Sequence, residues 1–311
     1  MVKSNVLYAA WCAGRPDSGY NKNTARHFGF SRYWTSRGCN IDWQHKAHSK
    51  QQWRKLFNEN NYKHVLLFNG NHSSMDVVRN LAHERNIGIT VFEGGFYVAR
   101  TFVLDRVGYG PHSTLCNDSF SWVDAALLDE FQVFKEAYIK NLTPKSSDYI
   151  IVPLQVEHDP TLKLYSNCDG RSISTMREWV EFIDTKFDGH KILYKSHPLH
   201  KNSFKLFRDL RKYTKHKITD PSTDTSYRSF MSFCGGAYMC LGIHSHAMAQ
   251  SMILDITTYA HAKCPMWRIR DGGKDKKKLN QFLAACYHNT VPIFDLEKTE
   301  AWYARNYPNT V

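Results

Sequence analysis

The sequence predicts an α/β protein of two domains, each built on a mainly parallel sheet with helices on its faces. The chain has 311 residues, of which 42% are hydrophobic, so it can fill two separate cores. Short continuous apolar runs alternate with helical patterns in two series along the chain. Continuous apolar runs are typical of strands buried on both faces, as in parallel sheets.

Three apolar runs of strand length define the N-terminal series, at residues 6–10, 64–68 and 87–92. Between the second and third runs, residues 73–82 begin with two serines and then place apolar side chains at helical spacing. A strand, a helix and a second strand in this order form a βαβ unit, whose strands are parallel.

The pattern restarts after residues 143–148, a polar stretch that we interpret as an interdomain linker. Ser174 is predicted to cap a helix with one apolar face. Further strands are predicted at 149–154, 191–195, 236–241 and 254–259. The apolar face comprises Met176, Trp179, Val180, Ile183 and Phe187.

These two series predict two Rossmann-like domains, residues 1–145 and 146–311, that face a central cleft. Residues 296–307 resemble a terminal helix, which we expect to pack back on the first domain.

The charge balance indicates an anionic partner. The chain has 41 basic and 29 acidic side chains and a net charge of +12, which favours contact with nucleic acid, a phosphorylated substrate or a membrane surface. The charges are dispersed except in residues 274–278. A solvated basic surface without a dedicated partner therefore stays the alternative.

Cysteine usage and the N-terminus favour a reduced, cytoplasmic protein. Eight cysteines are scattered without a C-x-x-C pair, which argues against a disulfide-stapled scaffold, a zinc ribbon or a redox motif. The histidines at 197 and 200, and at 244 and 246, lack a neighbouring carboxylate or cysteine cluster, so no metal site is predicted. The sequence shows neither a secretory signal nor an apolar run of membrane-spanning length.

Ligands of open α/β sheets bind beyond the carboxyl ends of the strands, so polar residues there are the candidates for function. Glu93 follows a buried strand directly and precedes Gly94 and Gly95. A carboxylate held in this way suits a general base that takes a proton from a hydroxyl group, and glycines allow a substrate to approach the backbone. The alternative is that Glu93 caps a turn.

Three segments of the second half carry further candidates. Lys195-Ser196-His197-Pro198 ends a strand, where a cation, backbone amides and an imidazole suit a nucleotide phosphate. His244-Ser245-His246 precedes small helical residues and suits a second phosphate-binding helix start, with a plain helix cap as the alternative. Gln155 and Glu157 follow the first strand of this half and suit contacts with a nucleotide or sugar.

Together these segments resemble the bacterial capsular-polysaccharide synthesis transferases of the β-Kdo transferase type, over roughly residues 60 to 265. The Val-Pro-x-Gln-Val-Glu-x-Asp signature at 152–159 is the most specific part, and Lys-x-His-Pro at 195–198 is the second. The acidic-Gly motif at 93–96, the loop at 105–110, Ser245 and residues 257–259 complete the resemblance. Gly94 stands where related transferases have a second acidic residue.

The resemblance implies a GT-B-like fold and a metal-independent glycosyltransferase that uses a UDP- or CMP-sugar and no other cofactor. It implies Glu93 as base and His197 as the group on the departing phosphate. The expected donor-binding residues are Gln155, Glu157, Lys195, Ser196, Pro198, His244, Ser245 and His246. The expected acceptor-binding residues are Gly94, Gly95, Arg15, Asp17, Tyr20 and Arg106.

Three hypotheses remain for the molecule on which the protein acts or to which it binds. In the first, it is a hydroxymethylated pyrimidine in DNA, as in phage DNA hypermodification, and the protein also binds DNA. The predicted DNA surface is a set of basic residues interleaved with aromatic ones. In the second it is a capsular or lipid-linked glycan, with a basic face on an anionic membrane. In the third the chain is a non-catalytic nucleotide-binding or nucleic-acid-binding protein. The interleaved residues are Arg15, Lys22, Arg26, Arg32 and Arg37 with Tyr20, Phe28, Phe30, Tyr33 and Trp34.

Overall fold

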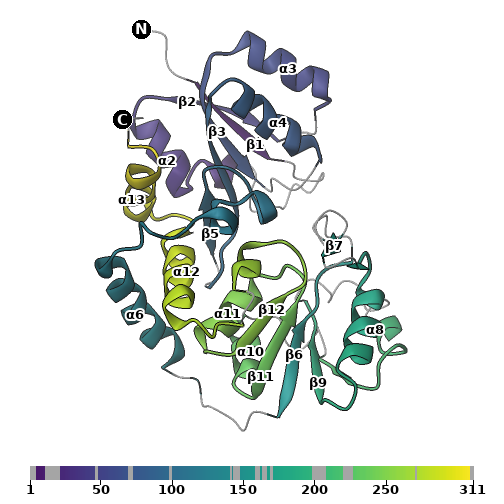
Figure 1. The fold of residues 1–311 in the computed structure, drawn as a ribbon. Coiled ribbons are helices and arrows are strands. Elements are labelled where there is room, and N and C mark those ends of the chain that lie inside the picture. The colour runs from purple at the N-terminus through teal and green to yellow at the C-terminus, as the bar shows by residue number, and fades with distance from the viewer. Residues whose placement is uncertain are drawn as a thin grey trace. The chain divides into compact units, whose positions relative to one another are not determined.

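A computed structural model shows an α/β protein that divides into two compact units (Figure 1). It describes residues 5–10, 22–45, 48–68, 73–97, 100–140, 142, 148–157, 162, 167–168, 171–197, 208–219, 227–269 and 272–308. The N-terminal unit comprises Met1–Gly95, Ala99–Thr114 and His288–Val311, and the C-terminal unit comprises Phe96–Val98 and Leu115–Tyr287. The predicted α/β class with parallel sheets is confirmed.

The N-terminal unit contains a six-stranded sheet in the order β13-β5-β4-β3-β1-β2. Strands β1 to β4 are parallel, β5 runs antiparallel to β4, and β13 runs antiparallel to β5. The predicted apolar runs form β1, β3 and β4, whereas β2, β5 and β13 were missed because they are short or only partly buried. The strands are β1 (Asn5–Ala10), β2 (Asn40–Gln44), β3 (Tyr62–Phe68), β4 (Gly88–Gly94), β5 (Thr101–Asp105) and β13 (Thr290–Pro292).

Helices cover both faces of this sheet because its strand residues alternate between two apolar clusters. Val6, Tyr8 and Ala10 contact one cluster, and Leu7 and Ala9 contact the other. The first cluster includes side chains of α2 and α13, and the second includes side chains of α3 and α4. The helices are α1 (Lys22–Ala25), α2 (Gly29–Ser36), α3 (Lys50–Glu59), α4 (Ser73–Glu84), η1 (Gly110–His112) and α13 (Leu296–Asn306).

The C-terminal helix α13 completes the core of the N-terminal unit. The Trp34 indole N–H donates to the Tyr303 hydroxyl at 3.0 Å, and the rings of Tyr33 and Tyr303 stack with centroids 4.0 Å apart. Trp302 is fully buried and donates its indole N–H to Asn289 Oδ1 at 2.7 Å. The end of the chain is therefore part of the same folding unit as its beginning.

The buried histidine of β3 makes the stability of this unit depend on pH. His64 is fully buried, with Nε2 2.8 Å from Thr90 Oγ1, and burial lowers its pKa from 6.5 to about 3. An unfolded histidine has a pKa of about 6.5, so below that pH the unfolded chain binds a proton that the folded chain does not. The stabilisation by neutral His64 is therefore fully present above pH 6.5 and is lost progressively as the pH falls towards 3.

Because of His64, we expect the free energy of unfolding to be about 2 kcal/mol lower at pH 5 than at pH 6.5. Each pH unit in this window corresponds to about 1.4 kcal/mol. Urea unfolding of the wild type and of His64→Gln at both pH values measures this difference. Gln has no titrating group, so its pH dependence should be smaller by that amount. Equal pH dependence in the two proteins would contradict the assignment.

The C-terminal unit contains a fully parallel five-stranded sheet in the order β10-β9-β6-β11-β12. Its first strand in sequence lies in the middle, which is the order of a Rossmann fold with its reversal between β6 and β11. The four predicted strands of this half correspond to β6, β9, β11 and β12. The strands are β6 (Tyr149–Pro153), β9 (Ile192–Lys195), β10 (Lys217–Ile218), β11 (Ala237–Gly242) and β12 (Thr257–Ala260), with a separate hairpin β7 (Asn167–Cys168) and β8 (Arg171–Ser172).

Two sets of helices cover opposite faces of this sheet. On one face α8 packs its Trp179, Val180 and Ile183 against β6, β9 and β11. On the other, Ser251 of α11 hydrogen-bonds Thr258 of β12 at 2.8 Å. The helices are α5 (Thr114–Asn117), α6 (Ala125–Ile139), α8 (Met176–Lys186), α10 (Tyr227–Cys234), α11 (Ala247–Ile253), η3 (Pro265–Arg268) and α12 (Lys276–His288).

The division into units differs from the predicted boundary at residue 145. Helix α6 precedes that boundary but lies in the C-terminal unit, where Lys135 pairs with Asp255 at 3.0 Å and Glu130 accepts a hydrogen bond from the Tyr287 hydroxyl at 2.8 Å. The chain returns to the N-terminal unit after Tyr287 because β13 pairs with β5. Pairing between distant segments is not visible in local sequence patterns.

Candidate functional site

The carboxyl edge of the C-terminal sheet collects most of the predicted donor-binding residues. Strands β6, β9, β11 and β12 are parallel, so they all end at this edge. Ligands of such sheets bind where the strand order reverses, here between β6 and β11. The segments after these two strands are therefore the main candidates for contacts with a ligand.

A hydrogen bond joins these two segments directly across the reversal point. The backbone N–H of His244, after β11, donates to Oε1 of Gln155, after β6, at 3.0 Å. Gln155 is 5% exposed and His244 is 3% exposed, so the bond is shielded from water. This hydrogen bond links two segments that are 89 positions apart in sequence.

Lys195 places a cation next to this bond. It pairs in register with Pro153 of β6, two residues before Gln155. The Lys195 side chain is 4% exposed, and its ammonium donates to the Ser196 carbonyl oxygen at 3.1 Å. A buried ammonium normally has a charged or polar partner, and the Ser196 carbonyl oxygen is one such partner of Lys195.

Ser196 has a structural role instead of the predicted one. Its backbone N–H donates to Thr219 Oγ1 at 3.0 Å, and its hydroxyl donates to the Thr219 carbonyl oxygen. The side chain is 1% exposed, so it connects β9 to the segment after β10 and does not face solvent. His197 follows and is half-buried, whereas Pro198 lies outside the described residues.

Glu157 supports a helix. Its Oε2 accepts the backbone N–H of Met176 at 3.0 Å, at the first residue of α8. Thr175, not the predicted Ser174, is the N-cap of that helix, and it forms a capping box with Glu178. The cap lies one residue later than predicted because Glu178 stands three residues after Thr175.

Ser245 and His246 lie at the start of α11. The Ser245 hydroxyl accepts the backbone N–H of Ala247 at 3.2 Å, but the N-cap of α11 is His246, which makes no side-chain capping hydrogen bond, so the plain serine cap of the alternative interpretation is not formed. The ring of His246 contacts Phe96 with centroids 4.4 Å apart. The amide of Gln250 also donates to the Phe96 carbonyl oxygen, at 3.2 Å. Phe96 is thus held by two residues of α11.

In the N-terminal unit, Glu93 and Gly94 close strand β4. Glu93 is half-buried and Gly94 is exposed. A Cβ atom on Gly94 would meet nothing within 4 Å, so space beside this backbone is available for a substrate. A Cβ on Gly95 would lie 1.9 Å from Thr101 Oγ1. Gly95 is therefore required by packing against Thr101, which differs from the predicted role in acceptor binding.

The structure does not bring Arg106 to Glu93. Because β5 runs antiparallel to β4, Glu93 pairs with Val103, and Asp105 pairs with Val91. Arg106 therefore lies towards the amino end of β4, away from the edge where Glu93 stands. Asp105 organises this loop by accepting hydrogen bonds from Val107, Gly108, Ser113 and Thr114. The strand pairing therefore places Arg106 away from Glu93 and does not support its predicted role in acceptor binding.

The predicted DNA-binding surface fails for its aromatic residues. Phe28, Phe30, Tyr33 and Trp34 are at most 5% exposed and lie in the core of the N-terminal unit. They cannot stack on extruded bases without unfolding. Arg15, Asp17 and Tyr20 lie outside the described residues.

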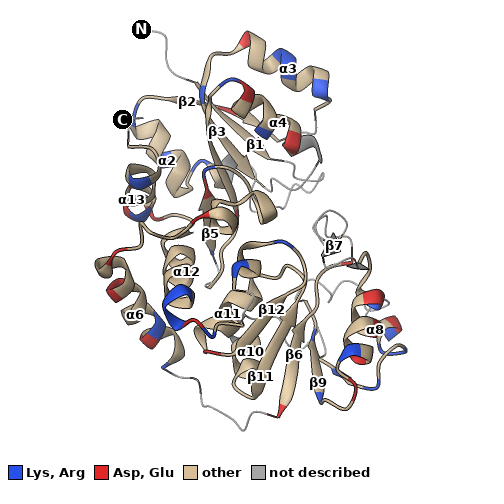
Figure 2. Cartoon of the chain, viewed as in Figure 1, with Lys and Arg blue, Asp and Glu red and all other residues tan. Residues whose placement is uncertain are grey.

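The basic residues of the described chain are dispersed. Figure 2 shows Lys and Arg on helices of both units and no single stripe. Arg37, one of the predicted DNA contacts, pairs with Glu300 at 3.4 Å and lies over the ring of Tyr33 at 3.7 Å. Part of the positive charge is thus engaged in an ion pair and a cation–π contact within the protein.

Sequence reasoning missed His261. Strand β12 ends at Ala260, one residue later than predicted, so His261 is the first residue beyond the carboxyl edge. Its backbone N–H donates to the Gly242 carbonyl oxygen at 2.8 Å, and the centroid of its ring lies 5.4 Å from that of Trp179. A histidine close to the end of a predicted strand was the sequence signal that could have placed His261 among the residues at the carboxyl edge of the sheet.

The described residues offer little for metal or thiol chemistry. Within them, no group of three or more His, Cys, Asp or Glu side chains is arranged to hold a metal ion. Burial raises the pKa of the Cys240 thiol to about 12, so it carries no thiolate at neutral pH.

Comparisons with known proteins agree with this geometry. Residues 129–225 match the family model described as "Capsule polysaccharide biosynthesis protein". This range includes Gln155, Lys195 and His197, but neither Glu93 nor His244. No protein of curated function is significantly similar in sequence.

Two solved structures from Thermosulfurimonas dismutans share the fold. The KpsC beta Kdo 2,7 transferase superposes with a TM-score of 0.58 at 17% identity, over 91% of this chain and 90% of that chain. The KpsC beta Kdo 2,4 transferase superposes with a TM-score of 0.59 at 12% identity, over 90% and 89%. The predicted GT-B-like fold class and the resemblance to capsule-synthesis transferases are confirmed.

Proposed function

We propose that this protein is a glycosyltransferase that binds a nucleotide-activated sugar at the carboxyl edge of its C-terminal sheet. The hydrogen bond from His244 to Gln155 carries the proposal, because it assembles two of the motifs at the reversal point of a Rossmann-type sheet. The likeness to KpsC Kdo transferases and the capsule-type family match support the same class of activity.

The donor phosphates are assigned to Lys195, His197 and Ser245. Lys195 supplies a buried positive charge beside Gln155, and a charge-assisted hydrogen bond to phosphate is stronger in such a shielded place. His197 donates a hydrogen bond or a proton as the nucleotide departs. Gln155 and Glu157 position the segments around the donor, which is a UDP- or CMP-sugar. Gln155 contacts the segment after β11, and Glu157 contacts the first residue of α8.

Glu93 is assigned the role of general base. It directly follows the buried part of β4 and has open space beside Gly94. A carboxylate in this position can remove the proton of an acceptor hydroxyl as the new glycosidic bond forms. A protein that only binds nucleotides has no need of such a group.

The acceptor is proposed to be a hydroxyl group of a capsule-type glycan. The family match and the structural relatives favour this alternative over a hydroxymethylated pyrimidine in DNA. The DNA hypothesis retains the net charge of +12 in its support, but four of the five aromatic residues expected to stack on bases, Phe28, Phe30, Tyr33 and Trp34, are buried in the core. Among the residues that the structure describes, no helix is long and apolar enough to cross a membrane.

Mass spectrometry of acceptors incubated with UDP- and CMP-sugars tests the proposal. We expect transfer to an oligosaccharide acceptor from one of these donors, and no transfer to hydroxymethylated DNA. We also expect activity to survive chelation by EDTA, because the mechanism assigns no step to a metal. Sugar attached to DNA would reverse the choice of acceptor. Nucleotide binding without transfer to any acceptor would favour a binding protein.

A further inference from the structure

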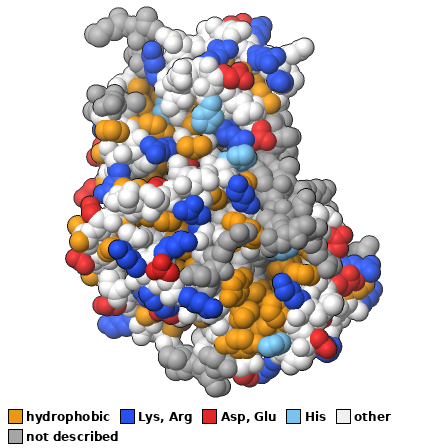
Figure 3. Space-filling model, in the orientation of Figure 1, with side chains coloured by type: hydrophobic (Ala, Val, Ile, Leu, Met, Phe, Trp, Pro, Cys, Tyr) orange, Lys and Arg blue, Asp and Glu red, His pale blue; other side chains and the backbone are white. Residues whose placement is uncertain are grey.

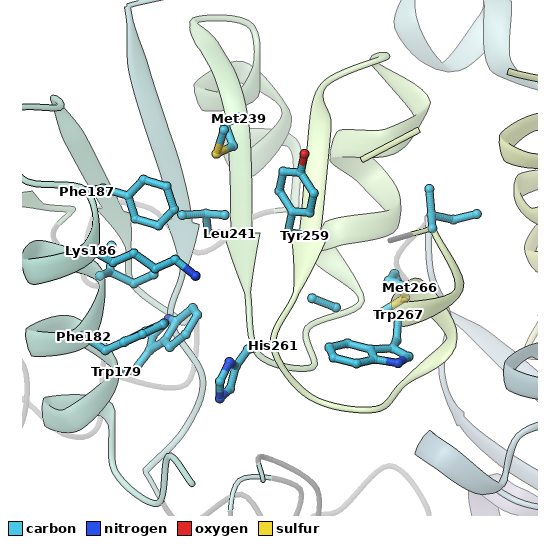
Figure 4. A pocket seen from close by; sticks show the side chains of 13 residues that line it. Trp179, Phe182, Lys186, Phe187, Met239, Leu241, Tyr259, His261, Met266 and Trp267 are labelled. Carbon is cyan, nitrogen blue, oxygen red and sulfur yellow. The ribbon is translucent and has the colours of Figure 1, made fainter. Parts of the chain in front are cut away.

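The C-terminal unit has an apolar groove that the donor site does not use. The groove has a volume of about 540 Å³. Figure 4 shows side chains of α8 on one side, Met239, Leu241 and Tyr259 of the sheet in the middle, and residues of η3 on the other side. The lining residues on α8 are Trp179, Phe182, Ile183, Lys186 and Phe187, and those after β12 include His261, Met266, Trp267 and Ile269.

The groove exists because α8 covers only part of one sheet face. Strand β12 alternates, so Thr258 faces α11 on the opposite side and Tyr259 faces the groove. Parallel sheets normally have both faces covered. Over β11 and β12, however, the described residues contribute only η3 to this face. Figure 3 shows the resulting cluster of hydrophobic side chains at the surface beside α8.

Lys186 adds a positive charge to the wall of this groove. Its ammonium lies 5.4 Å from the centre of the Phe182 ring, and Figure 4 shows it directed towards the sheet. The neighbouring acids pair elsewhere: Glu181 with Arg177 at 2.8 Å and Asp188 with Lys215 at 3.0 Å. Among the described residues, none provides a carboxylate within ion-pair distance of Lys186. Lys186 is exposed, so the groove combines an apolar surface with a solvated cation that has no ion-pair partner among the described residues.

The size of the groove fits a small ligand. Its volume falls within the range of about 300 to 1,000 Å³ that is usual for small-molecule sites. A contact with a second copy of the chain would need about 800 Å² of buried surface on each partner, and sedimentation distinguishes such a contact from binding of a small ligand.

The lining of the groove favours a hydrocarbon chain over a nucleobase. A base carries N–H and C=O groups that need partners when they are buried. Ile183, Leu241, Met266 and Ile269 offer none, and the polar groups of the lining are limited to those on Lys186, Tyr259, His261 and the two tryptophans. Methionine side chains adapt to flexible apolar ligands, and the aromatic walls supply a large apolar contact area.

We propose that this groove binds the hydrocarbon chain of an anionic amphiphile, with the charged head group at the Lys186 ammonium. The chain lies against β11 and β12, and the head group replaces the carboxylate that Lys186 lacks. This inference is independent of the glycosyltransferase assignment, because none of its residues belongs to the proposed donor or base set.

Isothermal titration calorimetry with dodecyl phosphate and dodecyl maltoside, both below their critical micelle concentrations, tests the inference on the full chain. We expect saturable 1:1 binding of dodecyl phosphate to the wild type. Lys186→Glu should weaken that binding by about tenfold or more, because it replaces an attractive charge with a repulsive one. The affinity for uncharged dodecyl maltoside should change by less than about twofold.

Two further variants separate the groove from general effects. Lys277→Glu makes the same change of charge on an exposed residue of α12 and should leave both affinities unchanged. Met239→Trp enlarges a side chain that lines the groove from β11 and should abolish binding of both amphiphiles, while its thermal unfolding midpoint shows that the protein is folded.

Several outcomes would overturn the inference. The first is the absence of saturable binding to the wild type. The second is an equal loss in Lys186→Glu and Lys277→Glu, which would indicate unspecific attraction. Displacement of dodecyl phosphate by CMP or UDP would identify a nucleotide site instead. A dimer in sedimentation that Met239→Trp dissociates would identify a contact between copies.

Discussion

Glu93→Gln is expected to lower the turnover number for glycosyl transfer by about 10² to 10⁴-fold, the usual contribution of a general base. Glutamine has nearly the same shape as glutamate but cannot accept the proton of the acceptor hydroxyl. The dissociation constant of the nucleotide sugar should change by less than about twofold, because donor binding is assigned to the C-terminal sheet. Steady-state kinetics and calorimetry on the same preparation measure the two effects separately.

A matched control for this experiment is Glu84→Gln. Glu84 is an exposed residue at the end of α4 in the same unit, so the substitution removes a charge without changing the edge of the sheet. It should leave turnover unchanged. If Glu93→Gln retains wild-type turnover, Glu93 is not the base and the carboxylate has the turn-capping role instead.

Lys195→Met is expected to raise the dissociation constant of the nucleotide sugar by about 30-fold or more, because loss of one partner from a buried charge pair costs about 2 to 5 kcal/mol. Methionine keeps the apolar stem within the buried position, which is 4% exposed in the wild type, but lacks the ammonium. Lys195→Arg restores a charge with different geometry and should recover part of the affinity.

Lys191→Met provides the control for Lys195. Lys191 precedes the same strand, β9, and its ammonium pairs with Asp148 at the surface. This variant lies at the amino end of the sheet and should bind the donor as the wild type does. Thermal unfolding of each variant separates loss of binding from loss of folding. A folded Lys195→Met protein with wild-type donor affinity would remove Lys195 from the phosphate site.

Features that depend only on residues adjacent in the sequence were predictable from local sequence patterns. The apolar runs that became β1, β3, β4, β6, β9, β11 and β12 were recognisable because buried parallel strands are continuous in hydrophobicity. Polar residues at or just beyond the ends of such strands, such as Lys195 at the end of β9 and Gln155 after β6, were recognisable for the same reason. The family resemblance of these segments was also recognisable from the sequence, since it rests on motif residues at fixed spacing.

Residues whose role depends on a distant partner were not predictable in this way. Ser196 resembled a phosphate ligand until Thr219 was seen to accept its hydroxyl. Gly95 resembled a glycine left open for substrate, but Thr101 fills the space beside it. The aromatic residues of α2 resembled a stacking surface, although α13, more than 260 positions away, buries them.

The sequence by itself determined the α/β class, the main strands and the order of the candidate motifs, because each of these is encoded in contiguous residues. Only the tertiary structure decided which strands are neighbours, and with them the position of each side chain. The antiparallel course of β5 moved Arg106 away from Glu93, and the reversal between β6 and β11 brought Gln155 to His244. Strand pairing is selected by the burial of whole apolar faces, and that choice involves residues from every part of a unit.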